Sequence, residues 1–274
     1  MAVKREVIVH AHIFKNAGTT IDWVLERNFG KHFCDNREDQ LMRTEKSYLN
    51  DFLENNKNIS VISSHSLPLP LEPHRQFEFY PIVMLRHPLL RVRSVYDFER
   101  QQKGCTPGAI NAKKKSFSEY VAWRMLPEVG HTIRNMQVRY LTFNSLPRVE
   151  QLDEDHLAAA LKFINDNMLV GVVELFDQSM VVFDQKFNDL GFDIDFSYKK
   201  QNVSSSSGIK LGADQKIAAL QDELGDDLYE LLLSKNELDM RLHQTARTLL
   251  STRFEQIKDS NFLLNDLRER CRAI

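Results

Sequence analysis

The sequence predicts an α/β protein with a mainly parallel β-sheet that helices cover on both faces, and with a helical region at the C-terminus. Short β-branched, apolar segments alternate along the chain with longer segments of helical periodicity, which is typical of parallel sheets. The first apolar segment, Glu6 to Phe14, leads directly into a tight polar loop and then a helix. From Ala213 onward the pattern is almost continuously helical.

The individual elements are predicted in chain order. Strands are expected over residues 6–14, 59–63, 80–85 and 168–173. Helices are expected over residues 21–27, 38–57, 89–103, 116–126, 131–142, 154–167 and 175–190. Within the helical C-terminal part, residues 213–274, a stripe of leucines is expected to pack on the rest of the molecule: Leu220, Leu224, Leu228 and Leu231. We find no internal repeat and no linker, so residues 1–274 are expected to form a single domain.

The composition limits the classes of partner. A chain of 274 residues, 42% of them hydrophobic, can bury a sizeable core. The 36 Lys and Arg residues nearly balance 38 Asp and Glu, so we expect no nucleic-acid or membrane partner, and any anion site must be local. Cys34, Cys105 and Cys271 match no disulfide framework and no zinc motif. The N-terminal apolar run is too short for a signal peptide, and a soluble, cytoplasmic protein is expected.

The first motif of chemical interest lies between the first strand and its helix and reads Lys15-Asn16-Ala17-Gly18-Thr19-Thr20. Backbone N–H groups, the positive helix end, a lysine and two hydroxyls can converge there on one phosphate-sized anion, in a P-loop-like arrangement. The order differs from the Walker pattern, because the lysine opens the loop and only one glycine is present. The alternative is a plain strand-to-helix turn in which Thr19 or Thr20 caps the helix.

The second motif follows the strand at 80–85 and runs from Arg86-His87-Pro88 to Tyr96. Arg86 stands at the carboxyl end of a strand, where α/β sheets bind ligands. Arg91 and Ser94 are three residues apart on the next helix, so both are predicted to turn toward the same crevice. An arginine fork and a hydroxyl are good ligands for a terminal phosphate.

Together the two motifs resemble those of sulfotransferases that use 3′-phosphoadenosine 5′-phosphosulfate (PAPS), in particular the heparan sulfate 2-O- and 6-O-sulfotransferases and their bacterial relatives. The family's 5′-phosphosulfate loop, H-x-x-K-[TS]-[AG]-G-[TS]-[ST], is matched from His12 to Thr20. Its 3′-phosphate motif, R-[DH]-P-x-x-R-x-x-S-x-[YF], is matched from Arg86 to Tyr96. Weaker similarity at 135–141 and 170–176 extends the resemblance over most of residues 5–235. The chain departs from the family at Asn16, where threonine or serine is usual.

The resemblance implies an enzyme that transfers the sulfuryl group of PAPS to a hydroxyl of an acceptor, expected to be a glycan, without a metal. Lys15 would act on the charge of the leaving phosphate. The 5′-phosphate would be held by the rest of the loop: Asn16, Ala17, Gly18, Thr19 and Thr20. Arg86 and Ser94 would hold the 3′-phosphate. A late basic pair, Lys199 and Lys200, would either close over the nucleotide, as a basic loop does in relatives, or be solvated surface charges.

His65 is the expected general base. It directly follows the strand at 59–63, at the same sheet edge as both motifs, and relatives with glycan acceptors place a catalytic histidine after this strand. A histidine near its ordinary pKa can accept a hydroxyl proton at neutral pH. The alternative is a histidine that only caps the strand end. His10 and His12 share one face of the first strand and are expected to be structural.

Two other function classes remain as alternatives. A P-loop kinase would need ATP and Mg²⁺; it is disfavoured by the missing G-K-[ST] order, and Glu174 is interpreted as a structural acid rather than a Mg²⁺ ligand. The second alternative is a non-catalytic protein of the same fold that binds a nucleotide or a glycan. The acceptor is expected to contact the loops at 66–79 and 104–130, where the lysine run 113–115 is either an anion-binding feature or a solvated face.

Overall fold

The computed structural model describes residues 4–199, 201 and 212–274. Its centre is a five-stranded sheet in the order β2-β3-β1-β4-β5, in which every pairing is parallel. The strands are β1 (Arg5–Ala11), β2 (Phe33–Asp35), β3 (Val61–Ser64), β4 (Phe77–Leu85) and β5 (Val170–Val172). In the central strand, Ile8 pairs with Val61 of β3 and with Tyr80 of β4. The parallel sheet that the sequence predicts is therefore confirmed.

Helices make up most of the rest of the described chain. They are α1 (Gly18–Phe29), α2 (Asp39–Thr44), α3 (Tyr48–Asn55), α4 (Pro88–Gln101), α5 (Pro107–Lys114), α6 (Phe117–Arg124), α7 (Met136–Leu141), α8 (Glu154–Asp166), α9 (Phe176–Asp189), α10 (Ala213–Leu224), α11 (Asp226–Ser234), α12 (Glu237–Gln256) and α13 (Ser260–Ala273). Short 3-10 helices, η1 (Gly30–His32) and η2 (Val173–Leu175), follow α1 and β5. No helix of the described ranges is both long and apolar enough to cross a membrane.

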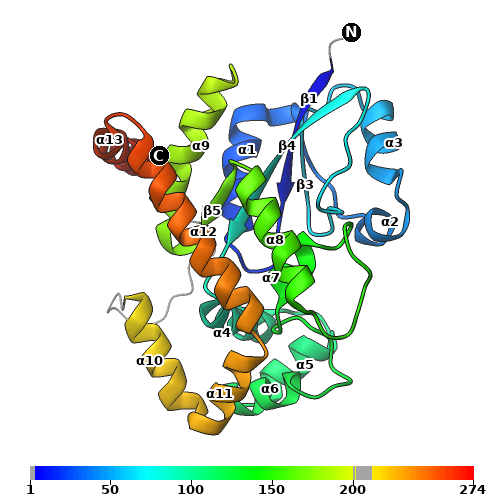
Figure 1. Cartoon of the computed structure of the whole chain (residues 1–274), viewed down its shortest axis with the longest axis vertical. Helices are drawn as coiled ribbons and strands as arrows, with labels where there is room; N and C mark the ends of the chain where they lie inside the picture. Colours follow the sequence, from blue (N-terminus) through cyan, green and yellow to red (C-terminus); the bar gives the residue numbers. More distant parts are fainter. Residues whose placement is uncertain (1–3, 200, 202–211) are drawn as a thin grey trace.

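The helices lie on both faces of the sheet, as the sequence predicts. The crossovers from β1 to β2 and from β4 to β5 leave the centre of the sheet in opposite directions, so right-handed connections place their helices on opposite faces. In Figure 1, α7, α8 and α12 lie in front of the sheet and α1 lies behind it. Helix α12 contacts β5, α8 and α9, whereas α10 and α11 pack against α4 and α6.

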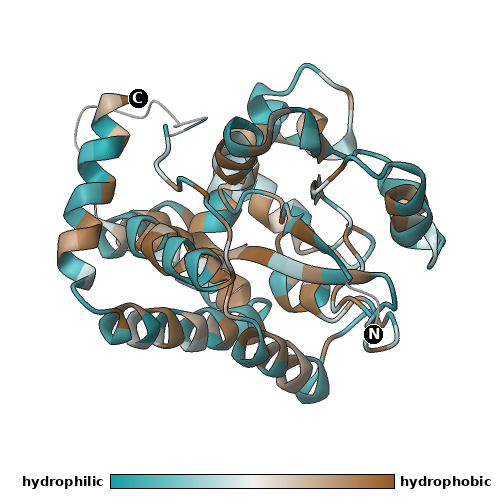
Figure 2. Ribbon diagram, turned by 90° about the horizontal axis from the view of Figure 1, so that it is seen from above, coloured by the Kyte–Doolittle hydropathy of each residue, from teal (hydrophilic) through white to brown (hydrophobic). Residues whose placement is uncertain are grey.

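Apolar side chains form two cores. The larger core lies between the sheet and its helices, and the smaller one lies among α4, α6, α10 and α11. Figure 2 shows apolar residues along the strands and on the inner sides of the helices. Leu220 and Leu224 join the smaller core as expected, but Leu231 is 40% exposed. Gly225, at φ 74°, separates α10 from α11 and changes the helical phase, so Leu232 is buried instead.

Several predicted boundaries are wrong. The first strand ends at Ala11 rather than Phe14, because the chain turns there to build the polar loop. The single helix expected over 38–57 is two helices, α2 and α3. The helix expected from 131 begins at Met136, since Asn135 adopts a left-handed conformation with φ 42°. Strand β2 and helix α5 were not predicted; β2 has only three residues, too few for a periodic signal.

The carboxyl ends of the central strands meet at one edge of the sheet. His12 follows β1, His65 follows β3 and Arg86 follows β4. Because β3 and β4 flank β1 on opposite sides, the chain changes direction across the sheet at this point. Such a switch point is where open α/β sheets form their ligand crevice.

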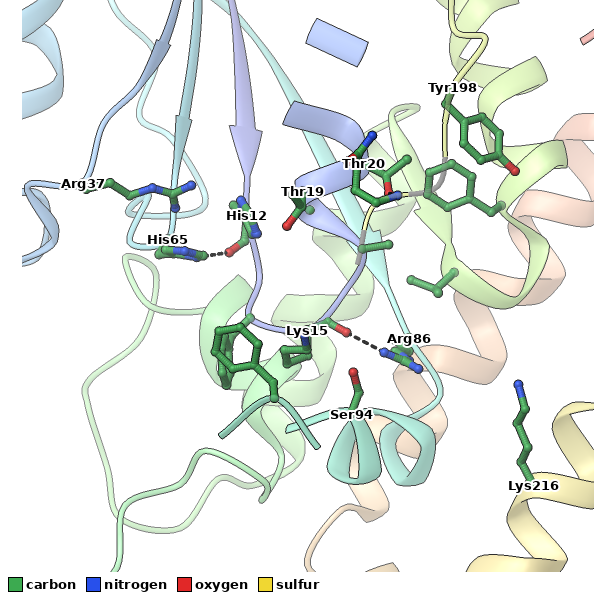
Figure 3. A pocket seen from close by; sticks show the side chains of 17 residues that line it. His12, Lys15, Thr19, Thr20, Arg37, His65, Arg86, Ser94, Tyr198 and Lys216 are labelled. Carbon is green, nitrogen blue, oxygen red and sulfur yellow. Dashed lines mark hydrogen bonds between the residues drawn. The ribbon is translucent and has the colours of Figure 1, made fainter. Parts of the chain in front are cut away.

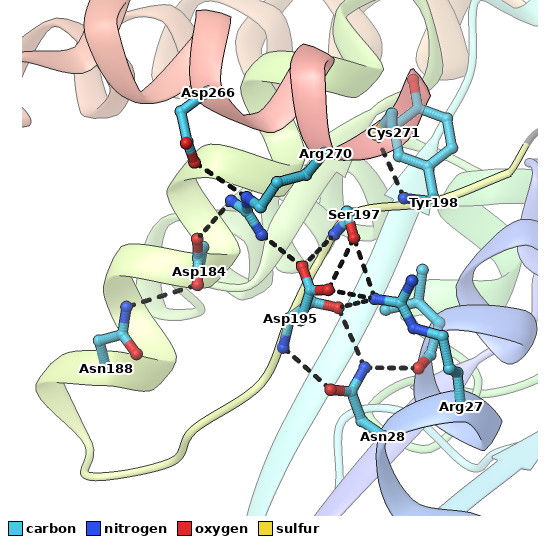
Figure 4. A network of polar contacts seen from close by, with 11 residues as sticks. Arg27, Asn28, Asp184, Asn188, Asp195, Ser197, Tyr198, Asp266, Arg270 and Cys271 are labelled. Carbon is cyan, nitrogen blue, oxygen red and sulfur yellow. Dashed lines mark hydrogen bonds and ion pairs between the residues drawn. The ribbon is translucent and has the colours of Figure 1, made fainter. Parts of the chain in front are cut away.

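A polar network attaches the segment after α9 to the helices around the sheet (Figure 4). Asp195 is its centre: it contacts Arg27 of α1 at 2.7 Å, the Ser197 hydroxyl at 2.7 Å, and Arg270 of α13. The Asp195 backbone N–H donates to Asn28 at 2.9 Å. These contacts fix the extended segment that carries Tyr198 toward the crevice.

Candidate active site

The crevice at this sheet edge is a pocket of about 550 Å³. Of the residues predicted to bind the donor or act in catalysis, it brings eight together: Lys15, Ala17, Gly18, Thr19, Thr20, His65, Arg86 and Ser94. Figure 3 shows the two histidines at one end of the pocket, Lys15 and Ser94 near its middle, and Arg86 and Lys216 at the other end. The two motifs, 66 residues or more apart in sequence, therefore line one cavity.

The polar loop presents uncapped backbone to this pocket. Lys15 and Ala17 have positive φ values of 66° and 61°, which folds the chain sharply between β1 and α1. Helix α1 begins at Gly18 with Ala17 as its N-cap and no side-chain cap, so the alternative of a Thr19 or Thr20 cap is wrong. The first N–H groups of α1 and its positive end are thus available to an anion.

Asn16 is the loop residue that faces away from the pocket. Its side chain is buried and donates to the Met84 carbonyl at 2.8 Å and to Gln137 Oε1 at 2.7 Å. Gln137 also accepts from the Arg86 backbone N–H and donates to the Arg86 carbonyl, both at 2.9 Å. The buried amides of Asn16 and Gln137 therefore join the first motif to the second.

Lys15 and Arg86 are neighbouring cations of the pocket, and neither forms an ion pair with a carboxylate of the described residues. The Lys15 ammonium lies 4.2 Å from the centre of the Phe98 ring, and burial together with the nearby Arg86 charge lowers the pKa of Lys15. Arg86 donates to the Lys15 carbonyl at 3.0 Å, and its buried Nε has no partner. Burial also lowers the pKa of Arg86. An anion that entered here would find positive charge already desolvated and fixed in direction.

Three predictions about basic residues need correction or qualification. Arg91 does not share the crevice with Ser94: it is fully buried and donates to the Phe14 and Thr132 carbonyls, at 3.4 and 2.6 Å. Lys199 is exposed and does not line the pocket. Lys200 lies outside the described residues. The late basic residue that lines the pocket is Lys216 of α10.

His65 lines both this pocket and a second cavity. Its Nδ1 lies 2.7 Å from the His12 carbonyl oxygen, which can only accept, so Nδ1 carries the proton and Nε2 is left with a lone pair. Burial, and then the nearby His12, lowers the pKa of His65. The ring is therefore neutral at pH 7 and is able to accept a proton through Nε2.

A buried cluster lies behind the two pocket histidines. Asp22 of α1 accepts from His10 Nδ1 through one oxygen and from His12 Nδ1 through the other, both at 2.7 Å. The Ser63 hydroxyl and the Arg37 guanidinium also approach Asp22, at 2.5 and 3.5 Å. Burial by itself would raise the pKa of Asp22, but its histidine partners lower it well below the ordinary value. The expectation that His10 is structural fits its full burial, whereas His12 lines the pocket.

Aromatic side chains form the wall of the pocket beyond the loop. Phe176 of α9 and Tyr198 lie with their ring centres 4.6 Å apart, and Val173 adjoins them. Glu174 does not line the pocket; it accepts from the His87 backbone N–H and contacts His243 Nε2 at 3.0 Å. This is the arrangement of the structural acid that the sequence predicts.

The second cavity, which we call the arginine pocket, has a volume of about 270 Å³. Its lining residues are Arg43, His65, Ser66, Leu67, Met136, Arg139, Tyr140, Phe143 and Arg148. The three arginines contact neutral oxygens: Arg43 the Ser66 hydroxyl, Arg148 the Arg43 carbonyl, and Arg139 the carbonyls of residues 149 and 150. No carboxylate of the described residues lines the cavity beside these three positive charges. A third pocket, of about 680 Å³, is lined by Phe14, Glu99 and several residues between 102 and 136.

Several lining residues were not found from the sequence. Phe98 follows Ser94 by one helical turn, so the spacing could have indicated it. Arg37 follows β2, a strand too short to recognise. Phe176 and Lys216 reach the pocket only through tertiary packing and gave no local signal.

The comparisons agree with this geometry. A sequence model of the sulfotransferase family matches residues 1–242. An uncharacterized protein of Archaeoglobus fulgidus is 29% identical over 247 residues, which cover 88% of this chain and 95% of that protein. Since the match spans the sheet, both sequence motifs and most of the helices, the chain belongs to the sulfotransferase family.

Proposed function

We propose that the protein transfers the sulfuryl group of PAPS to a hydroxyl of an acceptor, a saccharide. The observation that carries this proposal is the meeting of two anion-binding elements in one pocket, with the Arg86 guanidinium 3.0 Å from the Lys15 carbonyl. A nucleotide with phosphates at both ends of its ribose requires two such elements. ATP would need only one, together with a metal site.

The residues fit the donor in a defined order. The uncapped start of α1 and the Thr19 and Thr20 side chains suit the 5′-phosphate. Arg86 and Ser94 suit the 3′-phosphate, since the buried Arg86 Nε lacks a partner and the Ser94 hydroxyl faces the pocket (Figure 3). Lys15 lies between these groups, where a cation would stabilise the charge that grows on the leaving phosphate. The Phe176 and Tyr198 rings offer an apolar wall for the base of the nucleotide.

His65 is proposed as the general base. In-line transfer requires an acceptor hydroxyl whose proton leaves as its oxygen attacks sulfur. The proton on His65 Nδ1 is held by the His12 carbonyl, which directs the Nε2 lone pair away from that contact. Because His65 lines both the main pocket and the arginine pocket, a hydroxyl that entered from the arginine pocket would meet the base at the end of the donor.

The acceptor is proposed to enter through the arginine pocket. Leu67, Tyr140 and Phe143 supply apolar surface for a sugar ring, and the arginines suit an acidic substituent. The run Lys113–Lys115 belongs to neither pocket: Lys113 donates to the Gly104 carbonyl on the surface of α5. If an acidic acceptor is used, Arg139 and Arg148 are therefore better candidates to bind it than these lysines.

Calorimetry with 3′-phosphoadenosine 5′-phosphate (PAP) and AMP tests the donor assignment. PAP should bind about tenfold to a hundredfold more tightly than AMP, because the 3′-phosphate adds charge-assisted hydrogen bonds. Binding should not require Mg²⁺. Equal affinity for the two nucleotides would refute the assignment, and Mg²⁺-dependent binding of ATP in preference to PAP would favour a kinase.

A further inference from the structure

His12 joins the phosphate-binding loop to the partly buried carboxylate of Asp22. It leaves β1 at the pocket edge, and its ring lies directly over the start of α1: a Cβ added to Gly18 would lie 2.5 Å from His12 Nε2. Its other nitrogen, Nδ1, lies 2.7 Å from Asp22. No described residue forms a hydrogen bond with His12 Nε2. This nitrogen therefore faces the place where an anion would meet the first N–H groups of α1.

The charges around His12 determine its protonation. His10 is fully buried, its Nδ1 contacts Asp22 at 2.7 Å, and its Nε2 has no partner, so His10 presents no atom to an anion in the pocket. Arg37 lies 3.5 Å from Asp22 but is bound more closely, at 2.6 Å, to Asp35. Asp22 thus keeps negative charge that a cation at His12 could balance.

His65, the remaining titratable group against the His12 ring, differs in this respect. The two ring centres are 4.2 Å apart. His65 Nδ1 contacts a backbone carbonyl rather than a carboxylate, so nothing comparable to Asp22 supports an imidazolium there. Of the two pocket histidines, only His12 has a carboxylate hydrogen-bonded to it.

Burial is the largest effect on the pKa of His12 and lowers it; the nearby His10 and Arg37 act in the same direction, whereas Asp22 opposes them. A neutral His12 with its proton on Nδ1 would turn a lone pair toward an arriving phosphate. A proton on Nε2 replaces that repulsion with a charge-assisted hydrogen bond.

We infer that binding of the donor is coupled to uptake of one proton by His12, and that Asp22 is the positioning residue that makes this uptake favourable. The proton comes from solvent and forms the Nε2–H bond; no other bond changes. The imidazolium is then a second cation beside Lys15 at the 5′-phosphate. This inference rests on the proposed function, because it takes the ligand of the loop to be the 5′-phosphate of PAP or PAPS.

The test is calorimetry of PAP binding at about pH 7.5 in buffers of different ionisation heat, since the buffer dependence of the heat counts the protons exchanged. At this pH a phosphate monoester is mostly dianionic and an unperturbed histidine mostly neutral. The wild type should take up between about half and one proton more than the Asp22→Asn and His12→Gln variants. His65→Gln is the matched control and should take up as much as the wild type.

Affinity as a function of pH gives a second measurement. PAP affinity of the wild type should fall as pH rises from about 7 to 9, by no more than tenfold per unit, because a proton is bound in the complex. The Asp22→Asn and His12→Gln variants should bind about tenfold more weakly at neutral pH and lack this dependence. Thermal unfolding verifies that each variant is folded. Each of the two variants removes a different partner of the His12–Asp22 hydrogen bond.

The outcomes separate the inference from the proposed function. PAP binding without proton uptake by the wild type would overturn the inference and leave the function intact. If His65→Gln lost the proton uptake and His12→Gln kept it, the proton would be assigned to His65, and the inference would also be overturned. Failure of the wild type to bind PAP would instead refute the proposed function, and the inference with it.

Discussion

Replacing Gly18 by alanine tests whether the start of α1 and His12 form one rigid unit. The new Cβ would lie 2.2 Å from His12 Cδ2 and 2.5 Å from Nε2, closer than real Cβ atoms approach any neighbour. If the ring turns away, its charge-assisted bond to Asp22 is lost, which costs about 1.5–3 kcal/mol. If the helix start shifts instead, overpacking costs about 1–3 kcal/mol. Either route lowers the free energy of unfolding by about 2 kcal/mol.

In a protein of 274 residues, that loss corresponds to a fall in the unfolding midpoint of about 3–4 °C. Calorimetric unfolding measures it, and the same samples should bind PAP more weakly because the amides of α1 move. Gly104→Ala is the matched control, since nothing lies within 4 Å of its added Cβ. In a His12→Ala background the ring is absent, so Gly18→Ala should cost little. An unchanged midpoint, or an equal cost in both backgrounds, would refute the reasoning.

Other substitutions have distinct expected outcomes. Lys15→Ala should lower turnover about 10²–10³-fold, as expected for loss of a group that stabilises transition-state charge, while the unfolding midpoint barely moves. His65→Gln should lower turnover about 10²–10⁴-fold without weakening PAP binding. It should also remove the part of the pH profile in which activity rises as the histidine loses its proton. Because the pKa of His65 is lowered, this rise lies below about pH 6.5 in the wild type. Arg148→Gln should raise the KM for an acidic saccharide more than for its neutral counterpart, whereas Lys114→Gln, on exposed α5, should change neither. Asp195→Asn should lower the free energy of unfolding at pH 7 by about 1 kcal/mol. Burial opposes ionisation of Asp195, but hydrogen bonds from Ser197 and the charges of two arginines lower its pKa overall. The stability that Asp195 contributes is therefore present above the pKa of the unfolded state, and it should be lost as pH falls through the lower pKa of the folded state.

The sequence was sufficient for the features that depend on local pattern. Each of the four predicted strands overlaps a strand of the sheet, because buried parallel strands are short, apolar and bounded by polar residues. Both motifs could be placed at the sheet edge before the structure was known, since the carboxyl ends of parallel strands share one edge. Even the shared face of His10 and His12 followed from the alternation of a strand, and both side chains reach Asp22.

Features that depend on contacts between distant segments could not be predicted. Asp22 looks like an ordinary polar residue in the first turns of a helix. Its partners are His10 of β1, His12 just after that strand, and Ser63 of β3. Arg91 occupies the motif position expected to face the crevice, yet it lies beneath the loop and binds its Phe14 carbonyl. Helical spacing predicts the face of the helix on which a residue lies. Whether that face contacts solvent, a ligand or backbone depends on the segment that packs next to it.

The departure of Asn16 from the family pattern has a structural reason of the same kind. A threonine there would carry one hydroxyl, which is too short to replace an amide that donates to both the Met84 carbonyl and Gln137. Gln137 in turn has its backbone N–H bonded to the buried Asp239 carboxylate at 3.0 Å, so its position is fixed from the side opposite the pocket. The amide of Asn16 thus attaches the first motif to the strand that precedes the second, through the Met84 carbonyl and through Gln137, which Asp239 holds in place. The Asn16 side chain faces the interior rather than the pocket, and these buried hydrogen bonds set the distance between the two motifs.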